Sequence, residues 1–187
     1  MPNLLKQIPE TMRKQGIAEE TIAMFNVPET GGSEAVMELI TQMDNLLTKE
    51  QRLAIMQEQG CCKTGKPAAP HRAFGIEHKG KTLAEKVELL NKSDILHKAP
   101  CHLNGDGTLS VYWGADDLKN KSCPCGFTRK LPENYDVPKT FCGCCGGHIR
   151  SNYQKSLGVK LWLKEVVSSS SSSGGKKRCE FLYEVVE

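Results

Sequence analysis

The 187-residue chain has no strong charge excess and no long hydrophobic run. Its 25 lysines and arginines nearly balance 22 aspartates and glutamates, so the formal net charge is only +3. Proteins that bind nucleic acids or anionic membranes by charge concentrate more positive charge than this. No stretch approaches the roughly 18 apolar residues that a membrane-spanning helix requires. The composition therefore argues against a membrane partner and against a nucleic-acid partner.

No signal peptide is expected at the start of the sequence, and no internal repeat is visible in it. Residues 1–16 contain no apolar segment of the kind found in signal peptides, so we expect a cytoplasmic protein. Hydrophobic residues make up 39% and charged residues 25% of the chain, which is typical of a globular protein. We predict one domain spanning residues 1–187, with a mainly helical part at 1–98. The second part, 99–187, is predicted to hold a cysteine-rich hairpin, a helix and antiparallel strands.

Helical periodicity dominates the first part of the chain. Apolar residues recur at helical spacing within 33–47. Capping boxes at Thr48–Gln51 and Thr82–Glu85 predict the starts of two further helices. The apolar stripes of these helices are equally suited to the domain's own core and to a second copy of the chain, so a homodimer is one prediction.

Glycine and proline limit the helices elsewhere in this part. Pro9 predicts only short helical pieces near the N-terminus, and a helix at 18–25 is weakly indicated. Residues 61–81 contain several glycines and prolines and are predicted to form a loop.

The second part of the chain reads as strands around one helix. A hairpin is predicted at 99–113, and two strands with alternating apolar residues are predicted at 159–167 and 179–186. A short helix is expected at 147–157, ended by Gly158. The fold class is therefore α+β, with N-terminal helices packed on a C-terminal antiparallel sheet and a cysteine-rich loop region. The serine run between the last two strands is predicted to be a flexible connection.

Cysteine is the residue that the chain has in excess. Nine cysteines, an odd number and partly clustered, suit metal binding or thiol chemistry better than a disulfide framework. They occur at positions 61, 62, 101, 123, 125, 142, 144, 145 and 179.

Two of the cysteine clusters have a spacing typical of zinc sites. "CPCG" supplies Cys123 and Cys125, and "CGCCGGH" supplies Cys142, Cys145 and His148. Zinc is held by four thiolate or imidazole ligands in a tetrahedron, and sixteen residues separate the clusters. We predict a zinc ion bound by the four cysteines, with His148 or Cys144 as a substitute ligand. The roles of the other cysteines, Cys61, Cys62, Cys101, Cys144 and Cys179, stay open.

Three alternatives compete with this zinc site. The first is an enzyme that hydrolyses a C–N bond. Its nucleophile would be the Cys145 thiolate, activated by a helix N-terminus with His148 as its base, or a zinc-bound water. In the second, the segment is a zinc knuckle that binds nucleic acid, because aromatic and basic residues lie between the clusters. In the third, the cysteines are simply buried and reduced.

The C-terminal quarter of the chain resembles known families. A cysteine turn, Gly-His, a helix, and two strands joined by a Ser/Gly connection resemble the end of 4-vinyl-reductase-type ligand-binding domains. The segment is also similar to uncharacterised bacterial proteins of the aminothiazoline-carboxylate hydrolase type. The residues that carry this resemblance are Cys142, Cys145, Gly147, His148, Gly158, Ser168, Gly174, Gly175, Cys179 and Phe181. The resemblance implies an α+β fold with a metal or small-molecule site under the cysteine turn, contacted by Cys142, Cys145, His148 and Cys179. We therefore expect a zinc-binding protein that binds a small molecule.

Overall fold

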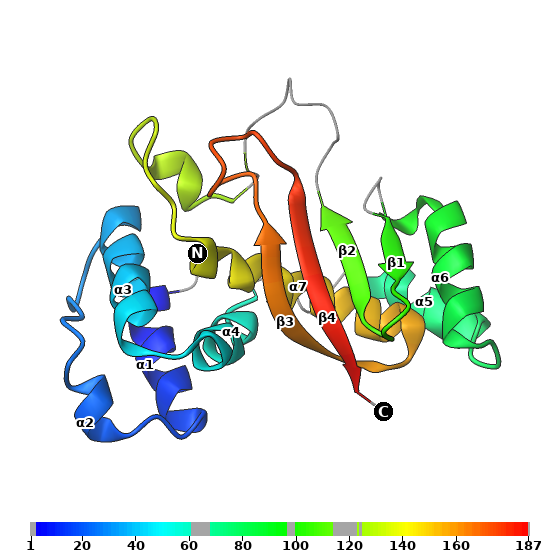
Figure 1. Cartoon of the computed structure of the whole chain (residues 1–187), viewed down its shortest axis with the longest axis horizontal. Coiled ribbons are helices and arrows are strands. Elements are labelled where there is room, and N and C mark those ends of the chain that lie inside the picture. The colour runs from blue at the N-terminus through cyan, green and yellow to red at the C-terminus, as the bar shows by residue number, and fades with distance from the viewer. Residues whose placement is uncertain (1–2, 61–67, 97–99, 114–122, 124, 187) are drawn as a thin grey trace.

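A computed structural model describes residues 3–60, 68–96, 100–113, 123 and 125–186, and Figure 1 shows the predicted α+β architecture. The α-helices are α1 (Leu4–Lys14), α2 (Glu19–Ile22), α3 (Ser33–Leu46), α4 (Lys49–Glu58), α5 (Ala69–Glu77), α6 (Leu83–Lys92) and α7 (Gly143–Leu157). The strands are β1 (Cys101–Leu103), β2 (Leu109–Trp113), β3 (Lys160–Ser168) and β4 (Cys179–Val186). A short 3₁₀ helix, η4 (Lys139–Cys142), runs directly into α7.

The four strands form one antiparallel sheet in the order β1-β2-β4-β3. Val111 of β2 pairs with Phe181 of β4, and Leu163 of β3 pairs with Tyr183 of β4. Side chains at alternating positions along each strand point to the same face, and Phe181, Tyr183 and Leu163 are buried. The alternation that predicted the two C-terminal strands is therefore confirmed.

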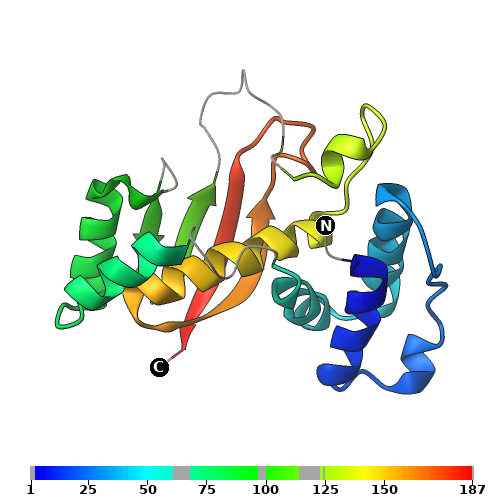
Figure 2. The same cartoon turned by 180° about the vertical axis from the view of Figure 1, so that it is seen from behind.

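Helix α7 crosses the buried face of the sheet, with α5 and α6 beside it (Figure 2). Glycine permits this close approach, because a Cβ on Gly146 would lie 2.8 Å from a methyl carbon of Leu163. The Tyr183 hydroxyl, which is fully buried, donates a hydrogen bond of 2.8 Å to the carbonyl of Gly146. Burial raises the pKa of Tyr183 well above its usual value, so this hydroxyl stays protonated.

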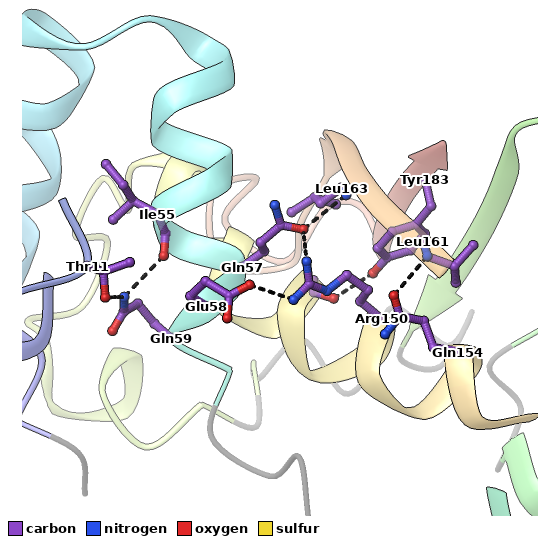
Figure 3. Close-up of polar contacts among 11 residues, drawn as sticks. Thr11, Ile55, Gln57, Glu58, Gln59, Arg150, Gln154, Leu161, Leu163 and Tyr183 are labelled. Atoms are coloured by element: carbon purple, nitrogen blue, oxygen red, sulfur yellow. Dashed lines mark hydrogen bonds and ion pairs between the residues drawn. The ribbon is translucent and has the colours of Figure 1, made fainter. Parts of the chain in front are cut away.

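Helices α1 to α4 pack into a second hydrophobic cluster beside the β3 edge of the sheet (Figure 1). A polar junction joins the two parts (Figure 3). Gln57 of α4 accepts hydrogen bonds from the Leu163 backbone N–H at 3.2 Å and from Arg150 of α7 at 2.6 Å. Arg150 also forms an ion pair of 2.7 Å with Glu58. Because Gln57 binds the outer edge of β3, the N-terminal helices are attached to the sheet at a defined register.

Both predicted capping boxes are confirmed. The Thr48 side chain accepts from the Gln51 N–H and the Gln51 side chain accepts from the Thr48 N–H, and Thr82 and Glu85 do the same. The hydrogen bonds from Thr82 lower the pKa of Glu85. Gly158 ends α7 with φ +71°, the left-handed conformation expected of a helix-ending glycine.

Two predictions for the N-terminal part are wrong. Pro9 does not break α1, because it lies inside this 11-residue helix, Leu4–Lys14. An internal proline costs roughly 3 kcal/mol, but each large apolar side chain buried yields roughly 1.5–3 kcal/mol. The helix buries four of them: Leu4, Leu5, Ile8 and Met12.

The second error is the loop predicted at 61–81, because residues 69–77 form α5. Pro70 lies in the first turn, where a missing N–H costs nothing. Gly75 is a packing residue, since a Cβ there would lie 2.0 Å from the carbonyl oxygen of Lys155 in α7. Residues 61–67, including Cys61 and Cys62, lie outside the described residues.

Within the described ranges, the structure contains no helix whose length and apolar character would suit it to crossing a bilayer.

Candidate functional site: a cysteine cluster

The cysteine-rich motif begins α7 itself. Helix α7 starts at Gly143, so Cys144 and Cys145 lie in its first turn and Cys142 is its N-cap. The prediction of a tight turn followed by a helix at 147–157 is therefore wrong by one turn. The three glycines of the motif, Gly143, Gly146 and Gly147, allow close packing rather than bending the chain. A Cβ on Gly147 would lie 1.9 Å from the carbonyl oxygen of Gln57, so α4 and α7 are in backbone contact here.

Six cysteines gather around this first turn. Burial first, and then the neighbouring sulfurs of Cys144, Cys142, Cys123 and Cys179, raise the pKa of Cys145 well above its ordinary value. Cys145 in turn raises the pKa of Cys125. The six cysteines therefore lie in one region of the molecule, although among the described residues no three of them are placed to hold one ion.

Cys123 and Cys125 form a hydrogen-bonded pair on the open side of the cluster. The hydrogen bond from Cys125 lowers the pKa of Cys123 to about 5, and burial opposes this shift. The same hydrogen bond raises the pKa of Cys125, which retains the proton. Both side chains are half-buried. Cys123 is therefore the more acidic sulfur of the pair, and the thiolate is the form of cysteine that binds metals and reacts.

The remaining sulfurs lie deeper. Burial raises the pKa of Cys142 to about 12, and burial also raises the pKa of Cys179. Cys142 donates a hydrogen bond of 3.1 Å to the Ser169 hydroxyl, and Cys144 donates one of 3.3 Å to the Gln59 carbonyl. Cys142, Cys145 and Cys179 pack with the sheet cluster, whereas Cys125 and Cys144 pack with the N-terminal cluster. The cysteines therefore lie where the two hydrophobic clusters meet.

The serine run is an ordered turn, which corrects the prediction of a flexible connection. Ser169 is fully buried, and its hydroxyl accepts a hydrogen bond of 3.0 Å from the Ser172 N–H. The Ser170 carbonyl accepts one of 2.8 Å from the Gly175 N–H, and Ser168 donates one of 2.7 Å to the Arg178 carbonyl. These bonds close the turn on itself, and the hydrogen bond between Cys142 and Ser169 joins it to the cysteine cluster.

An open groove of about 500 Å³ leads to the cluster from outside. The serine turn lines one side of this groove, and side chains from residues 128–137 line the other. Cys123 is the cysteine that faces this groove, together with polar and charged side chains such as Arg129 and Glu133. Asn134 lies on the rim with φ +65°, a left-handed conformation that is uncommon for residues other than glycine. A volume of several hundred Å³ is in the range of small-molecule sites.

His148 follows the cysteines by less than one helical turn. In the described structure its Nε2 lies 3.2 Å from the Asn152 amide, and its ring contacts Trp113 edge to face at 6.3 Å. Burial lowers its pKa, with a smaller contribution from Lys155. None of these interactions joins His148 to a cysteine, so the geometry does not group it with the sulfurs.

The described residues do not form a ready-made metal site. Within residues 3–60, 68–96, 100–113, 123 and 125–186, no three Cys, His, Asp or Glu side chains are already arranged to coordinate one ion. Burial raises the pKa of Cys142, Cys145 and Cys179, which favours the protonated thiol at each of these positions. Metal binding would have to remove these protons and draw the sulfurs together.

Cys101 is separate from this cluster. It lies buried in β1, and its backbone N–H donates a hydrogen bond of 2.9 Å to the Asn91 side chain. Burial raises its pKa to about 12. Cys101 therefore belongs to the sheet core.

The spacing of the cysteines left the role of Cys179 open, and the sequence did not connect the serine turn with the site. The available signal was the alternation of Cys179 with Phe181, which places both on the face of the sheet that α7 covers. The sequence could not show that the turn after β3 folds back over the same helix end.

Comparisons with family models, curated proteins and solved structures find no match for this chain, so its C-terminal resemblance to known families stays a prediction.

Proposed function

We propose that this protein binds a thiophilic metal ion, zinc in the first place, through the cysteine cluster at the start of α7. The proposed ligands are drawn from Cys123, Cys125, Cys142 and Cys145. The observation that carries the proposal is the gathering of six cysteines from three separate segments at one end of the sheet. Sites rich in thiolate sulfur favour zinc, Cu(I) and iron–sulfur clusters over hard ions such as Mg²⁺.

The charge distribution supports the same proposal. Burial raises the pKa of Cys142, Cys145 and Cys179, so an ion that binds here would have to displace their protons. An ion at this position would connect the sheet cluster with the N-terminal cluster, because the cysteines come from both. Metal binding would then stabilise the contact between the two parts of the molecule.

The groove beside Cys123 supports the second part of the proposal, binding of a small molecule. It is open to solvent, its size suits a small ligand, and its walls carry hydroxyl, carboxylate and guanidinium groups. A ligand in this groove would lie against the thiolate of Cys123 and hence against the metal.

Hydrolysis of a C–N bond by Cys145 and His148 has less support. A nucleophilic cysteine needs a lowered pKa, whereas burial and neighbouring sulfurs raise the pKa of Cys145. The zinc-knuckle alternative also has less support. Phe141 is buried and Phe127 packs on it with ring centres 6.1 Å apart, so these two rings are occupied within the fold.

The experiment that tests the proposal is titration of reduced, metal-free protein with Co²⁺ and Zn²⁺. Co²⁺ bound by thiolates gives sulfur-to-cobalt charge-transfer absorption, which zinc should then abolish by displacement. We expect one tightly bound ion per chain, lost in Cys142→Ser and retained in Cys101→Ser. Absence of this absorption in the wild-type protein would overturn the proposal.

A further inference from the structure

The serine turn makes three contacts with three different cysteines. Ser169, Ser170 and Ser171 are consecutive, and they approach Cys142, Cys179 and Cys123 respectively. The three cysteines come from the N-cap of α7, the start of β4 and the segment before η4. One short segment therefore reaches three sulfurs that lie far apart in the sequence.

Two of these contacts use a serine hydroxyl, and the third uses a backbone N–H. The Cys142 thiol donates a hydrogen bond of 3.1 Å to the Ser169 hydroxyl. The backbone N–H of Ser170 donates one of 3.4 Å to the Cys179 sulfur. The Ser171 hydroxyl lies beside Cys123, and its buried oxygen has no complete hydrogen bond within the part of the chain that the structure describes.

Hydroxyl groups suit a site that changes protonation. A serine hydroxyl accepts a hydrogen bond from a thiol and, after rotation, donates one to a thiolate. The same serine can therefore serve the metal-free thiol and the metal-bound thiolate. Hydrogen bonds to ligand atoms orient them and adjust their affinity for a metal, and loss of one commonly weakens binding about 10- to 100-fold.

We propose that Ser169–Ser171 form the hydrogen-bonding shell of the metal site, and that the turn marks Cys179 as a further thiolate ligand beside Cys123 and Cys142. The inference rests on the proposed metal binding and specifies which residues control it. The serines are positioning residues that act through the cysteines. Their side chains matter at two of the three positions, because Ser170 uses its backbone N–H.

The inference is tested by comparing alanine variants of the three serines, because Ser170 uses its backbone N–H and the other two use hydroxyl groups. Zinc affinity is measured by competition with a chromophoric chelator. Ser169→Ala and Ser171→Ala remove hydroxyls, and each should weaken zinc binding about tenfold or more. Ser170→Ala keeps the N–H and should bind within about twofold of wild type. Ser171→Thr restores a hydroxyl and should bind more tightly than Ser171→Ala.

A second control separates metal effects from folding effects. Ser156→Ala removes another fully buried, hydrogen-bonded serine, at the far end of α7, and should leave zinc affinity unchanged. Circular dichroism of each metal-free variant checks that it is folded. If Ser169→Ala does not fold, Ser171→Ala with its threonine rescue decides the question alone.

Cysteine variants test the ligand assignment. Cys179→Ser should lose zinc affinity and weaken the charge-transfer absorption of the Co²⁺ form. Cys144→Ser should bind as wild type does, because the Cys144 sulfur is turned toward the Gln59 carbonyl.

The outcomes distinguish this inference from the proposed function. If wild type binds zinc and Ser169→Ala, Ser171→Ala and Cys179→Ser bind equally well, the inference is wrong and metal binding stands. If the wild-type protein binds neither zinc nor Co²⁺, both are wrong.

Discussion

Both ends of α7 pack against polar groups, but the two ends differ in the hydrogen bonds that these groups make. At the C-terminal end, the Ser156 hydroxyl lies 2.8 Å from His71, and Lys86 donates a hydrogen bond of 2.8 Å to the Leu157 carbonyl. At the N-terminal end, sulfurs crowd together and the Ser171 oxygen lacks a complete hydrogen bond. Buried polar groups in native proteins are normally satisfied. The named groups at the C-terminal end therefore have direct polar contacts, whereas the N-terminal end has neighbouring sulfurs and an unsatisfied hydroxyl.

The largest expected effect on stability comes from breaking the backbone contact between α4 and α7, near the N-terminal end of α7. Gly147→Ala would place a Cβ 1.9 Å from the Gln57 carbonyl oxygen, which cannot move without shifting α4. We expect a loss of about 3 kcal/mol or more in the free energy of unfolding, measured by urea denaturation. Gly80→Ala is the matched control, since a Cβ there meets nothing within 4 Å. Equal stability of the two variants would contradict the packing described for α4 and α7.

A zinc ion should stabilise the protein through the cysteines at the N-terminal end of α7, without changing the contacts at its C-terminal end. At a free zinc concentration 100 times the dissociation constant, the gain is about 2.7 kcal/mol. Thermal unfolding with and without zinc measures this gain, and Cys142→Ser should abolish it. An equal zinc effect in the wild type and in Cys142→Ser would show that the ion stabilises the protein from another position.

At the C-terminal end of α7, removal of one partner should cost stability alone. Ser156→Ala removes the buried hydrogen bond between Ser156 and His71, at a cost of about 0.5–1.5 kcal/mol. Urea denaturation of the metal-free protein measures the loss. The zinc-induced increase in the melting temperature should be the same as in wild type. A smaller zinc effect in this variant would mean that the two ends are coupled.

The smallest effect concerns Cys101, the buried cysteine outside the cluster. Its pKa is raised from 9.0 to about 12 by burial, so the folded state holds the proton more tightly than the unfolded state does. Stability from this group is therefore complete below pH 9 and is lost as the pH rises from about 9 toward 12. Cys101→Ala should make the fall in stability above pH 9 less steep, measured by urea denaturation in metal-free buffer. An unchanged slope would mean that Cys101 ionises as easily when folded.

Local signals in the sequence predicted the local parts of the fold. A capping box needs only a hydroxyl and a side-chain acceptor three residues apart, and Thr48 and Thr82 confirm it. Likewise, the alternation in 179–186 fixes which residues face the core whatever the sheet's neighbours are. The α+β class followed from these patterns.

The errors arose where distant contacts decide the structure. Pro9 and Gly75 are unfavourable within isolated helices, yet burial of α1 and the close approach of α5 to α7 outweigh that cost. The serine run was predicted to be flexible from its composition, but its hydrogen bonds go to residues whose position only the folded chain defines. For the same reason, the spacing of the cysteines grouped Cys123, Cys125, Cys142 and Cys145, and only the resemblance to known families pointed to Cys179.

The most direct test of the metal proposal is elemental analysis of protein purified without chelator, combined with a count of the thiols that alkylate in the folded state. The proposal predicts about one zinc ion per chain, with protected thiols among Cys123, Cys125, Cys142, Cys145 and Cys179. Removal of the metal should expose Cys123 first, because it faces the groove. Protein without metal, in which added zinc changes the labelling of none of these cysteines, would contradict the proposal.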